Sequence, residues 1–312
     1  MTATPDTPTP PPSRARFRIA DQAWLLLMLP PLFWAGNAVL GRAVAGEVPP
    51  VGLAFWRWAV GTAVLLPFAW RPLLADRGVL LAHWRILLLL TVVGISLFNT
   101  LMYLGLESTT AVNAVMLQTA MPVLIVLMSF AFFRDRVTAA QALGILVSIA
   151  GALVLIAHGD LAMLLGLGFN AGDLFVLLAV ISYAAYTALL RRRPKVHPLS
   201  FIATIFGLGA LTLLPFYLLE TASGRPMPLT AQALLSVGYV SLFASILSYL
   251  CYNRVVLLLG ANTAGLSIHL VPVFGSLLAI AFLGESLHWY HAVGIALIAG
   301  GIVLATRRRA GA

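Results

Sequence analysis

The chain is a succession of long apolar runs separated by short polar segments. The runs are close to about 20 residues in length, which is what an α-helix needs to cross a bilayer core about 30 Å thick. The pattern therefore predicts membrane-spanning helices that follow one another along the whole chain. We place ten of them at residues 22–45, 51–70, 82–104, 111–132, 138–157, 172–190, 199–219, 231–256, 262–283 and 289–306.

The segment before the first apolar run has a different character. Residues 2–13 are rich in Pro and Thr, a composition typical of disorder, and we expect residues 1–20 to form a disordered cytoplasmic tail. The first run is long, lacks a small-residue cleavage site and is followed by many others, so we interpret it as a span and not as a cleaved signal.

Composition favours the membrane as solvent. The 312 residues are 61% hydrophobic and 9% charged, whereas a soluble domain is roughly 25% charged. Ten spans and their loops use the whole length, which leaves no room for a soluble catalytic domain. The single cysteine, Cys251, lies in an apolar run, so we expect no disulfide framework, no metal site and no cofactor.

The net charge of +9 raises the possibility of nucleic-acid binding, but the basic residues lie in short clusters at the ends of apolar runs. Clusters on one side of the predicted membrane hold most of the Arg and Lys, which is the positive-inside pattern. We therefore exclude a nucleic-acid partner and predict that both termini are cytoplasmic, as an even number of spans requires. The basic ends hold arginines 14, 16 and 18, Arg71, Arg77, Arg85, Arg134, Arg136, Arg191, Arg192, Arg193, Lys195, Arg254 and arginines 307–309.

The chain also repeats itself at a shift of 148 to 150 residues. Leu-Leu-Pro-Phe occurs at 65–68 and again at 213–216, and prolines and glycines of the fourth and fifth predicted spans recur in the ninth and tenth. Chance similarity of apolar helices is the alternative, but a nearly constant shift argues against it. Because each copy holds five spans, an odd number, the second copy enters the membrane upside down, as in many secondary transporters.

The predicted fold is therefore an all-α membrane protein of ten transmembrane helices, built as two inverted five-helix repeats around a central cavity. The first repeat covers residues 21–158 and the second covers residues 171–307.

Five short motifs carry a resemblance to a known family. In their order and spacing they resemble the drug/metabolite transporter superfamily, in particular the EamA-type ten-helix carriers, and among these the YddG-type amino-acid exporters. The resemblance implies a cavity lined by helices one, three, four, six, eight and nine, a place in the bacterial inner membrane, and export from the cytoplasm. The motifs are Leu32-Phe-Trp-Ala-Gly-Asn-Ala-Val, Ala54-Phe-Trp-Arg57, Met121-Pro-Val, Gly172-Asp-Leu and Phe282-Leu-Gly-Glu285.

Polar residues inside spans are costly in lipid and usually face the interior of the bundle, so they are the candidates for substrate binding. Trp34 and Asn37 lie three residues apart near the centre of the first span, and the matching sixth span has Tyr183 and Tyr186, also central and three apart. Residues at this spacing share a helical face. Ordinary packing between helices is the alternative for all four.

The third span contributes Asn99 and Tyr103, and the eighth contributes Tyr249 and Asn253 at equivalent positions in exchanged order. The spacing of four residues places each pair on one helical face, and we predict that these faces form a binding wall. The nearby serines of the eighth span are interpreted as close-packing residues.

Three further residues have open alternatives. Gln118 precedes Pro122 and His269 precedes Pro272, where proline frees a backbone carbonyl one turn earlier. His269 either bonds a substrate carboxylate or carries a proton, or it is a neutral histidine bonded to a neighbouring helix. Arg57, a charge within the second span, either snorkels outward or pairs with a helix C-terminus, or attracts a carboxylate.

The function predicted from these residues is secondary transport of a small molecule across the lipid bilayer. Candidate side chains of Trp, Tyr, Asn, Gln and His suit neutral amino acids or flat aromatic solutes. Sugar phosphates would need more Lys and Arg, and cationic drugs would need a buried acid. Purines and a broad set of hydrophobic metabolites stay open, as do an intramembrane enzyme and a channel, although no catalytic motif is present. A monomer is the working expectation.

Overall fold

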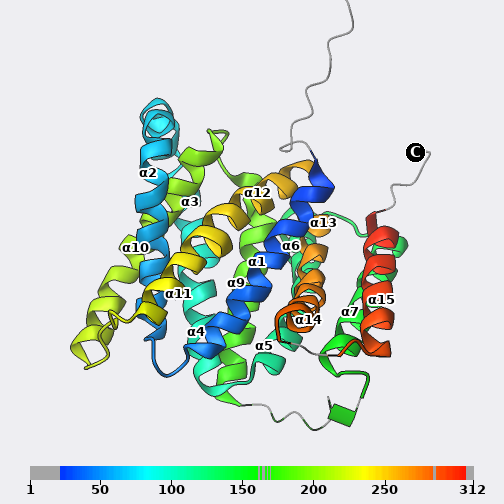
Figure 1. Cartoon of the computed structure of the whole chain (residues 1–312). Helices are drawn as coiled ribbons and strands as arrows, with labels where there is room; N and C mark the ends of the chain where they lie inside the picture. The colour runs from blue at the N-terminus through cyan, green and yellow to red at the C-terminus, as the bar shows by residue number, and fades with distance from the viewer. Residues whose placement is uncertain are drawn as a thin grey trace, which may run out of the picture.

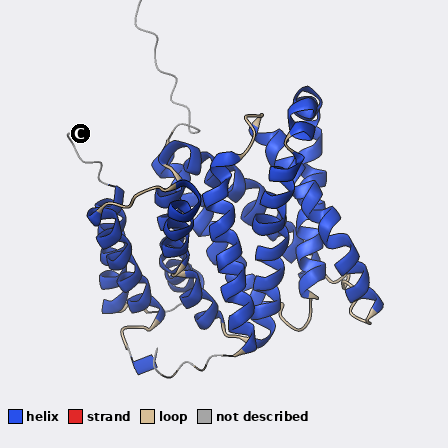
Figure 2. Cartoon of the chain, turned by 180° about the vertical axis from the view of Figure 1, so that it is seen from behind, coloured by secondary structure: helices blue, strands red, loops and turns tan. Residues whose placement is uncertain are grey.

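The computed structural model describes residues 22–160, 162–163, 166, 168, 170–283 and 286–306. Over these ranges the chain forms helices joined by turns and loops, with no strand, as Figure 2 shows. Ten of the described helical segments are long and apolar enough to cross a membrane. The motif residues Gly284 and Glu285, and the terminal arginines, lie outside the described residues.

The first half of the chain supplies five spans (Figure 1). Two of them are interrupted: the third by a π-helical turn and the fourth by a short break. The elements are α1 (Ala23–Ala43), α2 (Pro50–Ala82), α3 (Trp84–Thr91), the π turn Val92–Leu97, α4 (Phe98–Ser108), α5 (Ala111–Gln118), α6 (Met121–Phe133) and α7 (Ala139–Ile156).

The second half repeats this series. Its eighth span has a π turn and its ninth span is broken by a 3₁₀ turn. The elements are α9 (Ala171–Leu189), the 3₁₀ turn Leu190–Arg192, α10 (Pro198–Ala222), α11 (Ala231–Ser241), the π turn Leu242–Leu247, α12 (Ser248–Leu259), α13 (Ala261–Leu266), the 3₁₀ turn Ser267–His269, α14 (Leu270–Leu283) and α15 (Trp289–Thr306).

The irregular turns confirm the two-fold repeat. The π turn at Val92–Leu97 and the one at Leu242–Leu247 have the same length and start 150 residues apart. The break after α5 at Thr119 and the one at His269 are also 150 residues apart. Two copies that share such local departures from a regular α-helix have the same fold. Because each copy has five spans, an odd number, the second copy is inverted in the membrane.

The two halves pack against each other through equivalent helices. At one side of the molecule α2 lies against α10, and at the other α7 lies against α15 (Figure 1). Between them α1 of the first half packs on α12 and α14, and α9 of the second half packs on α4 and α6. Each half therefore inserts its first span between spans of the other, which places the central space at their junction.

Glycines set the approach of α7 and α15. A Cβ added at Gly144 would lie 2.5 Å from the carbonyl oxygen of Gly301, and one added at Gly151 would lie 2.8 Å from that of Gly294. The pairs are reciprocal, because Gly144 corresponds to Gly294 and Gly151 to Gly301. Small residues of this kind let helix backbones approach closely where lipid supplies no hydrophobic drive.

One predicted span is wrong in extent. The second span was expected to end at residue 70, but α2 continues to Ala82 through Pro67 and Pro72. A proline removes only one internal hydrogen bond, and beyond the apolar stretch Arg71 and Arg77 are exposed. The helix therefore continues past the predicted end of the span and carries both arginines.

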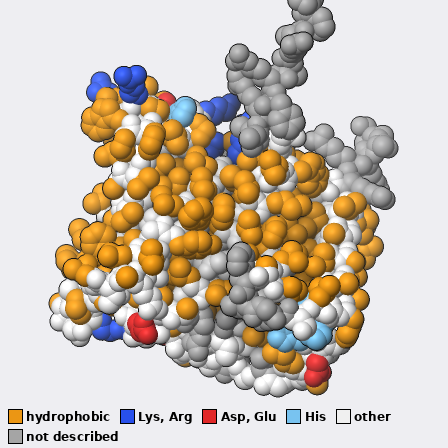
Figure 3. Space-filling view, viewed as in Figure 1, with side chains coloured by type: hydrophobic (Ala, Val, Ile, Leu, Met, Phe, Trp, Pro, Cys, Tyr) orange, Lys and Arg blue, Asp and Glu red, His pale blue; other side chains and the backbone are white. Residues whose placement is uncertain are grey.

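The surface is that of a membrane protein. Large apolar side chains are exposed around the middle of the molecule, while most of the visible Lys and Arg gather at the end that is uppermost in Figure 3. This is a multi-pass membrane protein, and the residues that the structure describes include ten apolar helices of spanning length.

Candidate functional site

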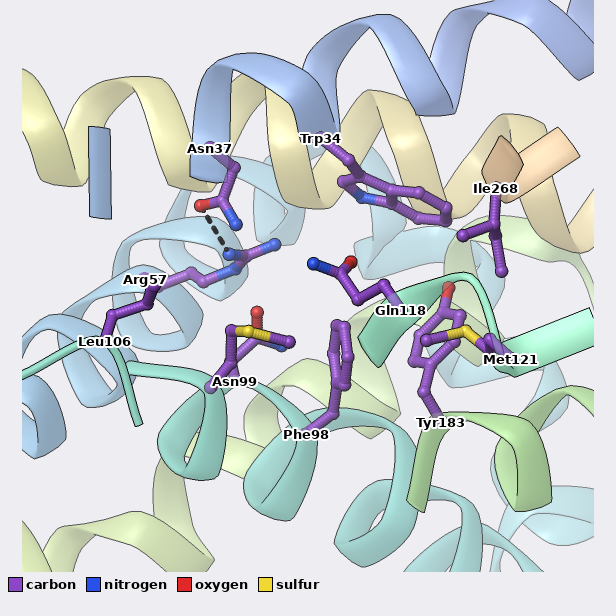
Figure 4. Close-up of a pocket in the computed structure, with 11 residues that line it drawn as sticks. Trp34, Asn37, Arg57, Phe98, Asn99, Leu106, Gln118, Met121, Tyr183 and Ile268 are labelled. Atoms are coloured by element: carbon purple, nitrogen blue, oxygen red, sulfur yellow. Dashed lines mark hydrogen bonds between the residues drawn. The ribbon is translucent and has the colours of Figure 1, made fainter. Parts of the chain in front are cut away.

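A pocket lies between the two halves, at the level of the helix breaks (Figure 4). Its walls come from α1, α2, α4, α5, α6 and α9 and from the 3₁₀ turn before α14. The lining side chains are Trp34, Asn37, Arg57, Phe98, Asn99, Met102, Leu106, Gln118, Met121, Tyr183 and Ile268. Arg57, Asn99 and Tyr183 are each 1% exposed, so these three side chains are buried in the wall of the pocket.

Aromatic rings form one end of the pocket. Trp34 meets Tyr183 edge-on, with ring centroids 5.7 Å apart, and Phe98 lies 4.5 Å from Tyr183 on the other side. Trp34 lies in the first span of the first repeat and Tyr183 in the first span of the second, so this contact joins the two halves. Rings arranged in this way offer both faces and edges to a flat apolar group.

Arg57 forms the opposite end of the pocket. Its guanidinium donates hydrogen bonds to Ser245 Oγ at 2.6 Å, Asn37 Oδ1 at 3.1 Å, Tyr103 Oη at 2.9 Å and the Ala244 carbonyl at 2.8 Å. Its side chain is 1% exposed, so the interpretation that it snorkels outward is wrong. Four neutral acceptors hold the guanidinium inside the bundle, which is why it does not extend to the interface.

The π turns supply carbonyl acceptors to both halves. A π turn shifts the backbone hydrogen bonds by one residue, which frees carbonyl groups for other donors. In the second half, the Ala244 carbonyl accepts from Arg57 and from Trp34 Nε1 at 3.2 Å. In the first half, the equivalent Gly94 carbonyl accepts from Tyr249 Oη at 2.7 Å. Each half thus receives donors from the other at the same position.

The remaining predicted residues lie behind the lining and are bonded to protein groups. Tyr186 Oη donates to Asn253 Oδ1 at 2.8 Å, and Tyr249 donates to Gly94 as described. His269 Nε2 lies 3.0 Å from the Thr119 carbonyl. The structure thus brings Trp34, Asn37, Asn99, Gln118 and Tyr183 together around one space and places Tyr103, Tyr186, Tyr249, Asn253 and His269 outside it.

The model of the EamA-like transporter family matches residues 22–157 and 170–307 of the chain. The chain belongs to this family. The uncharacterized transporter YyaM of Bacillus subtilis is 25% identical to it over 288 residues, which cover 91% of this chain and 93% of YyaM. An uncharacterized transporter of Archaeoglobus fulgidus is 25% identical over 291 residues, 91% of this chain and 97% of that protein.

One solved crystal structure has a TM-score of 0.72 to this EamA-like transporter at 22% identity, covering 91% of this chain and 96% of the other. At that identity the likeness supports the fold alone. The family and the relatives are transporters, so the interpretation of the chain as a membrane transporter and not an enzyme is confirmed.

Two prolines of this EamA-like transporter mark residues that line the pocket. Pro122 has no N–H to donate to the Gln118 carbonyl four residues earlier, and Pro272 has none for Ile268. Gln118 and Ile268 are equivalent in the two repeats, and both line the pocket. Backbone groups freed in this way inside a membrane protein occur where they face protein or a cavity.

Sequence reasoning missed six lining residues. Arg57 was noted as a charge within a span but was not selected as a lining residue. No acidic residue lies near the middle of a predicted span, and this was a signal that the partner of Arg57 is not a carboxylate of another span. Met121 and Ile268 adjoin the proline breaks, which could have identified them. Apolar lining residues otherwise carry no mark that separates them from lipid-facing or core positions. The six are Arg57, Phe98, Met102, Leu106, Met121 and Ile268.

Proposed function

We propose that this EamA-like transporter is a secondary transporter that exports neutral amino acids, including aromatic ones, in the manner of the YddG-type exporters. The observation that carries the proposal is the pocket between the halves. It joins an aromatic end, made by Trp34, Phe98 and Tyr183, to a polar end that contains amides and a single guanidinium. A neutral amino acid carries both kinds of group on one small molecule.

The charges of the pocket narrow the substrate class. Arg57 is the charged residue among the lining side chains, and no carboxylate is among them. An organic cation would therefore lack an ionic partner, and a phosphate ester would find one guanidinium where two negative charges need neutralising. A zwitterion of zero net charge, with an apolar side chain, agrees best with this set of groups.

Alternating access follows from the repeat. The halves share their π turns and their helix breaks, so an arrangement of the first half against the second has a near-equivalent in which the roles are exchanged. Exchange would move the access route of the pocket from one face of the membrane to the other. We infer that the Arg-rich end faces the cytoplasm of a bacterial cell, and that the substrate enters the pocket from that side and is released on the opposite side. One chain suffices, since one chain lines the pocket.

The aromatic end supports a second candidate. Trp34, Phe98 and Tyr183 would also stack on a purine or on a broad set of flat hydrophobic metabolites. Such substrates make no use of the guanidinium, which is why the amino acid is preferred.

Efflux from proteoliposomes tests the proposal. Vesicles containing the purified protein would be loaded with radiolabelled tryptophan, phenylalanine, threonine, methionine, adenine or an organic cation. We expect efflux of the neutral amino acids, reduced in Trp34→Ala and Asn99→Ala. Trp84→Ala is the matched control, because that tryptophan lies outside the pocket and is 55% exposed. Efflux of adenine or the cation alone would overturn the amino-acid proposal.

A further inference from the structure

Arg57 carries a buried positive charge that has no counter-ion among the described residues. The ion pairs within that part of the chain are Arg191 with Asp135 and Arg225 with Glu107, and both lie at the ends of the molecule. Arginine does not lose its proton in proteins. A buried charge without an opposite partner is costly, so its persistence at the wall of a pocket points to an anion that enters the pocket.

The hydrogen bonds of Arg57 leave room for such an anion. A guanidinium has five N–H donors. Nε donates to Ser245, Nη1 to Asn37 and Tyr103, and Nη2 to Ala244, so one N–H of Nη2 has no acceptor within the part of the chain that the structure describes. All four acceptors are neutral. They orient the guanidinium without cancelling its charge, which is what a preorganised anion site requires.

We propose that Arg57 is the residue that binds the carboxylate group of the substrate. The assignment of that carboxylate to an amino acid rests on the proposed function. Figure 4 shows the Gln118 amide between Trp34 and Phe98, directed toward the Arg57 end of the pocket. Its Nε2 donates to the Ala114 carbonyl at 3.3 Å. Its oxygen therefore serves as an acceptor for the substrate ammonium.

The pocket then orders the substrate along its length. The carboxylate lies at Arg57 and Asn37, the ammonium beside Gln118, and the side chain against Trp34, Phe98 and Tyr183. This order predicts that removal of the substrate's carboxylate charge weakens binding, whereas a change of its side chain among apolar types has a smaller effect.

Competition binding to the purified protein in detergent tests the assignment without transport. Radiolabelled tryptophan would be displaced by tryptophan, by tryptophanamide, which lacks the carboxylate charge, and by 3-phenylpropionate, which lacks the ammonium. We expect tryptophanamide to bind the wild type at least about 10-fold more weakly than tryptophan, the size expected for a lost hydrogen bond to a charged group. In Arg57→Gln this preference should vanish.

Controls separate binding from folding. Arg85→Gln, at an exposed arginine near the end of the molecule, should keep the wild-type preference. Arg57→Lys keeps the positive charge but loses the planar guanidinium that can donate two parallel hydrogen bonds. We expect it to retain part of the preference for tryptophan over tryptophanamide. If Arg57→Gln does not fold, the affinities of the wild type and of Arg57→Lys for tryptophan and tryptophanamide still test whether Arg57 binds the carboxylate.

The outcomes distinguish this inference from the proposed function. Equal affinity of tryptophan and tryptophanamide for the wild type overturns the role of Arg57 and leaves amino-acid transport standing. A wild type that binds no neutral amino acid, but binds labelled 3-phenylpropionate in an Arg57-dependent manner, overturns the proposed function and supports the anion site. Binding of neither compound overturns both.

Discussion

His269 Nε2 lies 3.0 Å from the carbonyl oxygen of Thr119, the residue that holds the equivalent position in the other half of the molecule. Since a carbonyl only accepts, the ring nitrogen donates its hydrogen. Both residues lie where their spans are broken, just before Pro122 and Pro272. The two broken helices are thus joined to each other at their breaks, close to the axis that relates the repeats.

His269→Leu should therefore lower the stability of the protein. The variant leaves the buried Thr119 carbonyl without this donor, which costs about 1–3 kcal/mol. Thermal unfolding in detergent measures the effect, with His83→Leu at an exposed turn as the control. A variant as stable as the wild type would show that the contact between the two breaks does not contribute to the fold.

A second prediction contrasts two Gly→Ala changes within helices. In Gly144→Ala the new Cβ would lie 2.5 Å from the Gly301 carbonyl and 2.6 Å from the Ala305 nitrogen, so α7 and α15 must separate. Overpacking of this kind costs about 1–3 kcal/mol. At Gly78 a new Cβ would meet no atom within 4 Å other than those of its chain neighbours and its own helix backbone, and alanine there should stabilise α2 by about 0.5–1 kcal/mol.

Unfolding temperatures of the two alanine variants check this contrast, because both replace hydrogen by methyl at a helical position. A similar change in both variants would mean that helix propensity, and not the approach of α7 and α15, determines the outcome.

A third prediction concerns the start of α2, the helix that carries Arg57. The Glu220 carboxylate accepts hydrogen bonds from the backbone N–H groups of Val51 at 3.2 Å and Gly52 at 2.7 Å. It thus caps the positive end of the helix dipole from a span of the other half. Glu220→Ala should cost about 1 kcal/mol. Thermal unfolding measures the loss, with Glu47→Ala in an exposed turn as the control, and an equal loss in both would contradict the cap.

The repeat and the spans could be predicted from the sequence because apolar length and shared prolines and glycines are local signals. Pro122 and Pro272 even marked two residues of the pocket. Which face of a helix meets the pocket is decided by the other half, and no local pattern records it. Asn99 and Tyr249 hold equivalent positions, but Asn99 lines the pocket while Tyr249 bonds to the Gly94 carbonyl.

The hydrogen-bond partners of Arg57 could not be predicted from the sequence either. Two of its acceptors, Ala244 and Ser245, lie in the π turn of the eighth span, nearly 190 positions away in the sequence. The periodicity of apolar residues does not predict a π turn. The sequence therefore carries no sign that Arg57 would bond to the Ala244 carbonyl, which only that turn frees. The end of α2 was also predicted wrongly. A proline can end a helix or lie within one, and α2 continues through Pro67 and Pro72.

Asn37→Asp gives the last prediction, because it changes charge with almost no change of shape. Asn37 Oδ1 accepts from Arg57 at 3.1 Å and from Tyr103 at 2.9 Å. An aspartate keeps both hydrogen bonds at Oδ1 and adds a negative charge beside the guanidinium, so the variant should fold with a stability equal to or above that of the wild type. If Arg57 binds the substrate carboxylate, the aspartate side chain pairs with the guanidinium in place of that carboxylate.

We therefore expect Asn37→Asp to bind tryptophan at least about 10-fold more weakly than the wild type, the loss expected when a charge-assisted hydrogen bond is removed. Its affinity for tryptophanamide should stay within a few-fold of the wild type, which makes the amide an internal control for the shape of the pocket. Competition binding measures both values on the same preparation. Full tryptophan affinity in Asn37→Asp would mean that the charge of Arg57 takes no part in recognition, because neutralising it in place would have had no effect.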